Sequence, residues 1–304
     1  MIMPMVLTAR QLAAGGFSMS EGEGAPVVCR LRPEELFQFG PMLGIPDRVI
    51  EESGRGGPSK LESHDGFDFL MLNVPDHQDL SAPCRQSSIY FRKGLLVFTG
   101  GEDPLLDGIL SEEEGRERPI PTLLLTYFDR LTGGDFSALE GLEEEIEDLE
   151  DALITKKKDN CIREIIELRK KLRVLHRYYE QLSSLLEAME ENSNGLLDKK
   201  ALRFVHLLAG RADRLCGNVR SLRDYVTQVR EAYQAQVDIS LNSLMKLFTV
   251  VTTIFLPLSL IAGWYGMNFP MPEYRWALGY PVVICVSVAV VVVCILLFKK
   301  KKWL

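Results

Sequence analysis

The sequence lacks the residue patterns that mark several common functional classes. No two of its six cysteines are spaced as C-x-x-C, so neither a disulfide framework nor a zinc motif is indicated, and a reducing compartment suits the soluble part. The chain also has no glycine-rich phosphate loop, no nucleophile motif and no paired-histidine metal motif. We therefore expect no enzymatic activity, no cofactor and no nucleic-acid partner.

Charged residues are missing from two stretches near the C-terminus. They make up 25% of the 304 residues, and the net charge is −7, yet none lies between Leu247 and Pro272 or in "PVVICVSVAVVVVCILLF" at 281–298. Each stretch is long enough to cross about 30 Å of hydrocarbon. We predict membrane spans at about 245–264 and 281–298. The alternative, a buried helical hairpin, would need apolar cover on every side.

The lysines after the second span indicate the orientation. Positively charged residues stay on the cytoplasmic side of a membrane, so the C-terminus is expected inside, and two spans place the N-terminal part inside too. The N-terminal "MIMPMVLTARQLAAGG" has no basic region before an apolar one, so no secretory signal is expected. The outward loop is then 265–280. Four aromatic residues in or beside it suit the membrane–water interface: Trp264, Tyr265, Tyr274 and Trp276.

The remaining sequence predicts two cytoplasmic regions, 1–118 and 119–244, before a transmembrane domain at 245–304. In the first region, "APVVCRL", "FDFLMLNV", "SSIYF" and "LLVFTG" are rich in β-branched and aromatic residues and predict strands. "PEELFQFG" and "PDRVIEES" predict helices that start at proline, whereas "SGRGGPS" and "HQDLSAPCRQ" predict loops. This is an α/β domain whose sheet order the pattern does not determine.

The second region is helical throughout. "PTLLLTYFDRLTGG" ends at a glycine pair, and the next helix has eight acidic and no basic residues between Glu140 and Asp151. Two apolar lines follow in steps of three and four, which is typical of helices packed along their length. The first line is Ile165, Leu168, Leu172, Leu175, Tyr179, Leu182, Leu186 and Met189; the second is Leu208, Ala212, Leu215, Val219, Leu222, Val226, Val229 and Tyr233. With no stop before Pro257, the last helix should reach about 65–70 residues and about 100 Å.

A polar stripe recurs on the opposite face of this last helix. Asp224, Glu231, Asp238, Met245, Thr252 and Ser259 are seven residues apart, and Asn242, Thr249, Leu256 and Gly263 form a second line offset by four. Small hydroxyl residues in a span also bond to their own backbone or to neighbouring helices. However, a single helix cannot shelter such a stripe from lipid, whereas several copies around an axis would enclose a polar path. We therefore expect a homo-oligomer, with Pro257 bending the helix.

The end of the first span resembles a known family. Tyr265, Gly266, Met267 and Asn268 spell "YGMN" within "MKLFTVVTTIFLPLSLIAGWYGMNFPMPEYRW", and the chain ends "KKKKWL". These residues resemble the signature of the CorA-type divalent metal cation transporter family, closely over about 238–304. The resemblance implies an α+β membrane protein: a funnel-shaped homopentamer with an N-terminal cytoplasmic α/β domain and a long helical stalk continuous with the first of two C-terminal transmembrane helices. It also implies that the protein lies in the lipid bilayer of a bacterial inner (plasma) membrane.

The same resemblance assigns roles to individual residues. Asn268 would ring the outer mouth and contact the ion through its water shell, with Gly266 and Met267 setting the loop and Glu273 its one negative charge. The pore would be lined by Asn242, Met245, Thr249, Thr252, Leu256, Ser259 and Gly263. Asp224, Glu231 and Asp238 would extend it into the cytoplasm, and Lys299, Lys300, Lys301 and Lys302 would form a basic collar. Mg²⁺ is favoured by the "MPE" of the loop, with Zn²⁺, Co²⁺ and Ni²⁺ as other possible cargoes.

The chain departs from the family pattern in two places. Leu256 stands where a methionine is often found, and it keeps a bulky apolar group at the constriction. Leu207 and Gly210 lie near the places where the family has the acidic residues of an inhibitory metal site, so the resemblance does not imply regulation by bound Mg²⁺.

Three alternatives remain open from the sequence. The chain could be a Zn²⁺-selective member of the family, or a membrane-anchored helical scaffold without transport. In addition, His64, Asp65, Asp76 and His77 could form a transition-metal site, although solvated loop residues are the simpler interpretation.

Overall fold

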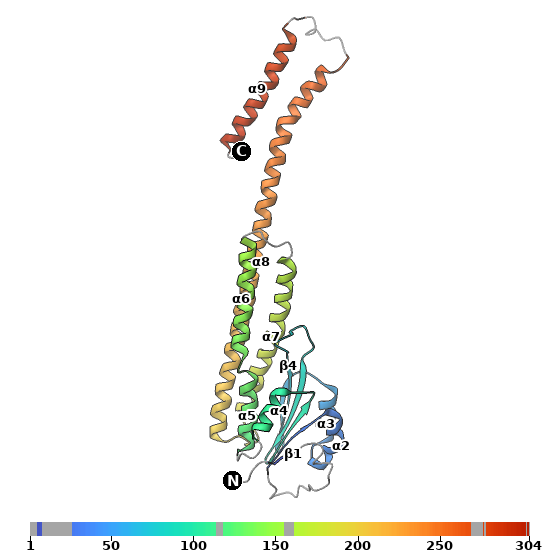
Figure 1. The fold of residues 1–304 in the computed structure, drawn as a ribbon, viewed down its shortest axis with the longest axis vertical. Coiled ribbons are helices and arrows are strands. Elements are labelled where there is room, and N and C mark those ends of the chain that lie inside the picture. Colours follow the sequence, from blue (N-terminus) through green and yellow to red (C-terminus); the bar gives the residue numbers. More distant parts are fainter. Residues whose placement is uncertain are drawn as a thin grey trace. The chain divides into compact units, whose positions relative to one another are not determined.

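The structure is a computed structural model that describes residues 5–7, 26–113, 118–154, 161–268, 276, 278–301 and 303. It divides into two compact units, Met1–Val229 and Arg230–Leu304 (Figure 1). The first unit contains a β-sheet and several helices, and the second contains two long helical segments. Helix α8 (Lys199–Tyr265) begins in the first unit and ends in the second. The domain boundaries after residues 118 and 244 that the sequence suggests stay a prediction.

The first unit is built on a mixed sheet with the strand order β1-β2-β6-β5-β4-β3. Strands β1, β2 and β6 are parallel, and the pairs from β6 to β3 are antiparallel. Four strands follow the predicted segments, while β1 and β3 were not predicted. The bounds are β1 Met5–Leu7, β2 Val27–Leu31, β3 Lys60–His64, β4 Phe67–Val74, β5 Arg85–Arg92 and β6 Leu95–Gly100.

Helices cover both faces of this sheet. On one face, α2 (Pro33–Phe39), the short η1 (Pro41–Leu43) and α3 (Asp47–Arg55) enclose an apolar core that includes Cys29, whose thiol pKa burial raises to about 12. On the other face, Phe98 packs edge-on against Tyr127 with ring centroids 5.2 Å apart. Tyr127 belongs to α5 (Ile120–Leu131), which follows α4 (Pro104–Glu113).

Two predicted loop boundaries are wrong by a few residues. The loop "SGRGGPS" begins too early, because α3 continues to Arg55. The loop "HQDLSAPCRQ" ends too late, because β5 already begins at Arg85. In both places pairing or helix continuation with neighbouring segments overrides the local turn composition.

Three long helices form the rest of the first unit: α6 (Asp135–Ile154), α7 (Cys161–Glu190) and the N-terminal part of α8. Every residue of the first predicted apolar line is buried, and so is the second line from Leu208 to Val229, with Tyr233 half-buried. Helix α8 has 67 residues, which confirms the predicted length. The periodic apolar residues therefore identified the packed faces.

Buried polar contacts join the sheet to these helices. His77 Nε2 in the β4–β5 loop lies 3.2 Å from Asp135 Oδ1, and Asp135 is only 3% exposed. Burial raises the pKa of the Asp135 carboxyl, against the opposing effects of His77, Tyr179 and Arg211. Arg85 and Tyr127 likewise reach Asp103, at 2.8 and 3.2 Å. The solvated-loop interpretation of His77 is thus wrong.

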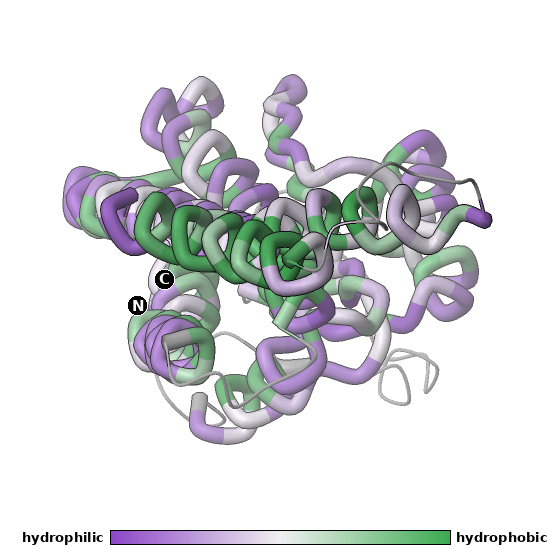
Figure 2. Tube along the Cα trace, turned by 90° about the horizontal axis from the view of Figure 1, so that it is seen from above, coloured by the Kyte–Doolittle hydropathy of each residue, from purple (hydrophilic) through white to green (hydrophobic). Residues whose placement is uncertain are grey.

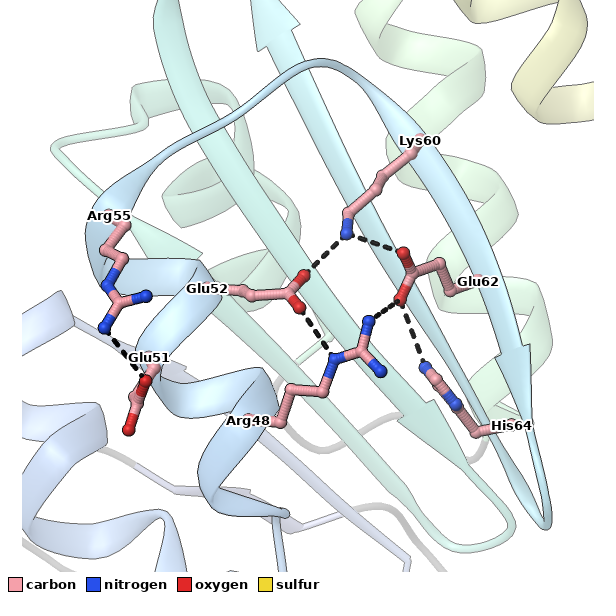
Figure 3. Close-up of polar contacts among 7 residues, drawn as sticks. All are labelled: Arg48, Glu51, Glu52, Arg55, Lys60, Glu62 and His64. Carbon is pink, nitrogen blue, oxygen red and sulfur yellow. Dashed lines mark hydrogen bonds and ion pairs between the residues drawn. The ribbon is translucent and has the colours of Figure 1, made fainter.

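A second polar network joins α3 to the edge strand β3 (Figure 3). Lys60 Nζ donates to Glu52 Oε2 at 2.6 Å and to Glu62 Oε1 at 2.7 Å. Arg48 Nε donates to Glu52 at 2.9 Å, and His64 Nε2 lies 3.2 Å from Glu62. The hydrogen bond from Lys60 is the main cause that lowers the pKa of both Glu52 and Glu62.

Replacing Lys60 by methionine (Lys60→Met) is expected to lower the thermal unfolding temperature at neutral pH by a few degrees. Because a lowered carboxyl pKa stabilises the fold above the usual pKa, that stabilisation is lost as pH falls through the folded-state value. The variant should therefore lose less stability than the wild type on acidification. The loss at neutral pH should be about 1 kcal/mol or less, since these groups still contact solvent.

The measurement is thermal unfolding of the full chain in detergent from neutral to acidic pH. Arg55→Met is the matched control, because the Arg55–Glu51 pair on α3 is largely exposed and should contribute almost nothing. An unchanged pH profile in Lys60→Met would contradict the role given to this network.

The second unit consists of the C-terminal part of α8 and helix α9 (Gly279–Lys300). Figure 2 colours α9 as hydrophobic over most of its length. Both helices contain an apolar stretch of 18 residues that is long enough to cross a membrane. Only 6% of each stretch is buried within the chain. A buried core hairpin is thus inconsistent with the structure, and a membrane is the environment that these side chains fit.

Candidate functional site

The polar stripe lies on the C-terminal part of α8, in the second unit. Its residues are all exposed in the single chain: Glu231, Asp238, Asn242, Met245, Thr249, Thr252, Leu256, Ser259 and Gly263. Leu256 is 74% exposed, among the highest values of any large apolar side chain described. The described chain has no contact that covers this face, so its polar side chains are available to a partner or to water.

The two threonine hydroxyls of the stripe donate to their own helix. Thr249 Oγ1 donates to the carbonyl oxygen of Met245 at 2.8 Å, and Thr252 Oγ1 donates to that of Phe248 at 2.7 Å. This is the backbone bonding that the sequence left open as an alternative. Because each hydroxyl proton is committed to the backbone, each oxygen presents only lone pairs outward. The face therefore offers hydrogen-bond acceptors.

Pro257 lies inside α8 and has no N–H to donate to the carbonyl oxygen of Thr253. Cys294 Sγ of α9 is 4.0 Å from that same oxygen, at the limit for a weak sulfur hydrogen bond. The proline therefore frees a backbone acceptor at a place where α9 lies beside α8. Gly263 lies six residues after Pro257. A Cβ atom at this position would meet no other atom within 4 Å, so the packing of the described chain does not require glycine there.

Helix α8 ends at the "YGMN" segment. Gly266 N donates to Ala262 O at 2.9 Å, and Met267 N donates to Trp264 O at 3.3 Å. A Cβ atom at Gly266 would lie 2.9 Å from Ala262 O, closer than side-chain carbons normally approach, so glycine fits this turn. Tyr265 is half-buried and Asn268 is exposed directly after the turn. Glu273 lies outside the described residues.

The basic residues lie at the end of α9. Lys299 and Lys300 occupy its last turn, where positive charge favours the helix dipole. Lys301 follows as the C-cap residue, with its Nζ atom 5.9 Å from the centre of the Trp303 ring. Lys302 lies outside the described residues.

Asp224, in the first unit, has different neighbours from the rest of the acidic line. It lines a groove between α7 and α8 together with Arg169, Arg173 and Arg223. Sequence reasoning overlooked these arginines, because it considered only the apolar line of α7. The sequence does contain a signal for them, because Arg169 and Arg173 are four residues apart and therefore lie on the same face of a helix.

The described residues contain no group of three or more His, Cys, Asp or Glu side chains placed to hold a metal ion. His64 contacts Glu62 and stacks on Phe67, whereas His77 contacts Asp135. Asp76 accepts a hydrogen bond from the backbone of Gln78. The proposed transition-metal set is therefore not assembled.

The chain is similar to known proteins over most of its length. A family model described as "CorA-like Mg2+ transporter protein" matches residues 30–300. A cobalt/magnesium transport protein CorA of Thermotoga maritima is 32% identical over 190 residues, which cover 62% of this chain but only 54% of that protein. The cobalt/magnesium transport protein CorA of Methanocaldococcus jannaschii is 25% identical over 284 residues, 90% of this chain and 89% of that protein.

A solved structure shares the fold. The complete structure of the CorA magnesium transporter from Methanocaldococcus jannaschii superposes with a TM-score of 0.77 at 23% identity, covering 94% of this chain and 95% of that one. The α/β domain, the long helix and the C-terminal apolar helix all belong to the matched architecture.

Proposed function

We propose, on the premise that the chain belongs to the CorA-like Mg²⁺ transporter protein family, that it assembles as a homopentamer and conducts a hydrated divalent cation through a central pore. The observation that carries this proposal is the exposed polar stripe of α8, which continues into the otherwise apolar C-terminal part of the helix, just before Gly266-Met267-Asn268. Mg²⁺ is the favoured ion, since two similar proteins are named for magnesium as well as cobalt transport. No enzymatic step is part of the proposal.

The stripe would line the pore because lipid cannot accommodate it. Within the predicted span 245–264, Ser259 and the outward lone pairs of Thr249 and Thr252 would find no hydrogen-bond donor in lipid, and Asn242 lies just before the span. Around a five-fold axis the same groups would face water and ions. Met245, Leu256 and Gly263 would complete the lining, with Leu256 as an apolar constriction that controls wetting.

The acceptor character of the threonine oxygens supports passage of a hydrated ion. Water molecules bound to a dication point their hydrogen atoms outward, so they donate to whatever surrounds them. Thr249 and Thr252, whose own protons are committed to the backbone, can accept those hydrogen bonds. Mg²⁺ gives up its water reluctantly, so contact through the water shell avoids that cost.

Asn268 would place a ring of neutral amide oxygens at the outer mouth. Such a ring holds a hydrated dication through its waters without the strong binding of a carboxylate ring. The turn set by Gly266 and Met267 would orient it, and Glu273 would add the one negative charge of the loop. A neutral ring favours release into the pore, and two charges that cross 100 mV gain about 4.6 kcal/mol.

At the cytoplasmic side, Glu231 and Asp238 would attract the ion along its path. Asp224 would continue the same acidic line, although it shares its groove with three arginines in the single chain. The lysines 299–302 would surround the inner end of the pore as a basic collar. By the positive-inside rule they would also keep the C-terminus, and with two spans the N-terminus, in the cytoplasm. We therefore propose a multi-pass protein of a bacterial inner membrane.

The experiment is an ion flux assay with the full chain in liposomes. Mg²⁺ uptake that follows the membrane potential and persists without a pH gradient would support an ion channel, and uptake that requires the gradient would indicate proton-coupled transport. Uptake of Zn²⁺ but not Mg²⁺ would identify a zinc-selective member. Absence of any dication flux from correctly assembled protein would favour the helical scaffold.

A further inference from the structure

A small groove between α7 and α8 collects three arginine side chains in the first unit. Arg169 and Arg173 come from α7, one helical turn apart, and Arg223 comes from α8. Asp224 and Thr227 of α8 complete the lining of a cavity of about 100 Å³. All five residues are exposed at its rim. The groove shares only Asp224 with the polar stripe, whose other residues follow Arg230 in the chain.

Within the described part of the chain, the three guanidinium groups lack an ionic partner. Among the residues that the structure describes, no carboxylate lies within 4.0 Å of any of them. Two other cations on the same helices are paired: Lys171 with Glu145 at 2.7 Å, and Arg211 with Asp129 at 2.8 Å. Arg177 and Arg214 on the same helices also lack a carboxylate partner among the described residues, so what distinguishes this groove is that three guanidinium groups converge on it.

The local charge is unfavourable without an added anion. Three positive charges and one negative charge leave the lining net positive, in a chain whose total charge is −7. Like charges at i and i+4, such as Arg169 and Arg173, destabilise a helix. An anion between the guanidinium groups would remove this repulsion.

The shape and donors of the groove select the kind of anion. Thr227 Oγ1 donates to the carbonyl oxygen of Arg223 at 2.9 Å, so the donors left for a ligand are the guanidinium N–H groups. Planar guanidinium groups bind phosphate oxygens in pairs. The groove has about 100 Å³ of space between these side chains, which is enough for a phosphate group.

We propose that this groove binds a phosphate group, held by Arg169, Arg173 and Arg223. The phosphate comes either from a soluble phosphate ion or ester or from a lipid headgroup, which offer the same oxygens. The carboxylate of Asp224 at the rim repels the anion, so it weakens the binding that the three arginines provide. The site goes beyond the proposed transport function and does not depend on it.

The first test is calorimetric titration of inorganic phosphate into the full chain in detergent. R169Q/R173Q should weaken binding by about tenfold or more, because charge-assisted hydrogen bonds are lost. Asp224→Asn should strengthen binding, a change of opposite sign that misfolding cannot produce. The matched control is R177Q/R214Q, which removes one exposed arginine from each of the same two helices outside the groove, and it should leave the affinity unchanged.

The second test separates the two sources of phosphate. The full chain is placed in nanodiscs of phosphatidylcholine with or without phosphatidic acid, and the bound lipid is counted by native mass spectrometry. Retention of phosphatidic acid that R169Q/R173Q abolishes supports a lipid source, even if free phosphate binds weakly. Binding of free phosphate alone supports a soluble source.

Two results would overturn the proposal. One is that neither phosphate nor phosphatidic acid distinguishes R169Q/R173Q from R177Q/R214Q. The other is that R169Q/R173Q changes only the number of assembled subunits, which would mean that acidic side chains of a second copy occupy the groove.

Discussion

Replacing Asn268 by alanine (Asn268→Ala) is expected to reduce Mg²⁺ flux into liposomes by at least about tenfold. The change removes every amide oxygen from the proposed outer ring, and each lost hydrogen bond to the ion's water shell is worth roughly 1–3 kcal/mol. Asn268 is exposed after the turn at Gly266, so alanine disturbs no contact within the described chain. The measurement is uptake followed with a Mg²⁺-sensitive dye inside the liposomes.

Two further variants distinguish loss of the amide ring from a nonspecific loss of transport. Ser287→Ala removes a hydroxyl on α9 that donates to Val283 O at 2.8 Å within its own helix, so it should leave flux unchanged. Asn268→Asp keeps the shape but adds charge, and should bind Mg²⁺ more tightly while conducting more slowly. Wild-type flux in correctly assembled Asn268→Ala would show that the mechanism at the outer mouth is wrong.

Replacing Leu256 by serine (Leu256→Ser) is expected to have the opposite effect, an increase in resting flux of about tenfold or more. Leu256 is a bulky apolar residue between the polar residues Thr252 and Ser259 of the stripe and is 74% exposed in the single chain. Apolar constrictions in pores exclude water, and a hydroxyl would keep the passage wet. Tenfold corresponds to about 1.4 kcal/mol in the barrier.

The control for this variant is Val251→Ser, one and a half turns earlier on the face of α8 away from the stripe. It changes an exposed apolar residue to the same polar one, so it tests whether any serine in the span causes a leak. Flux that rises equally in both variants, or in neither, would remove Leu256 from its role as a constriction.

The helical part of the fold could be predicted in detail because its information is local. The apolar lines of α7 and α8 repeat every three or four residues, and burial of Leu172 and Val219 follows from that period. The length of α8 was also predictable, because no helix-ending signal precedes Pro257 and one internal proline did not stop the helix. The polar stripe could be read from the same period.

The sheet could be predicted only in part. Strand β3, with the sequence KLESH, has few β-branched or aromatic residues, and it forms because its backbone pairs with β4 and its side chains Lys60 and Glu62 bond to each other and to α3. The parallel pairing of β2 with β6 joins residues far apart in the chain, so the strand order is not contained in local patterns.

The polar contacts of the first unit were least accessible to sequence reasoning. His77 meets Asp135, and Asp224 shares a groove with Arg169, only because distant segments pack together. The residues at the membrane end were predicted instead from their spacing on one helix and from a short motif, both of which are contiguous in sequence. Their roles in transport stay predictions.

The central claim, that the polar stripe of α8 faces a water-filled pore, is tested most directly by cysteine accessibility. Single cysteines replace Thr252 and Val251 in a background without Cys84, Cys285 and Cys294, the three cysteines that are not buried. A positively charged thiol reagent should stop Mg²⁺ flux through Thr252→Cys and leave Val251→Cys active. Block of Val251→Cys instead, or no block of Thr252→Cys, would contradict the proposed pore.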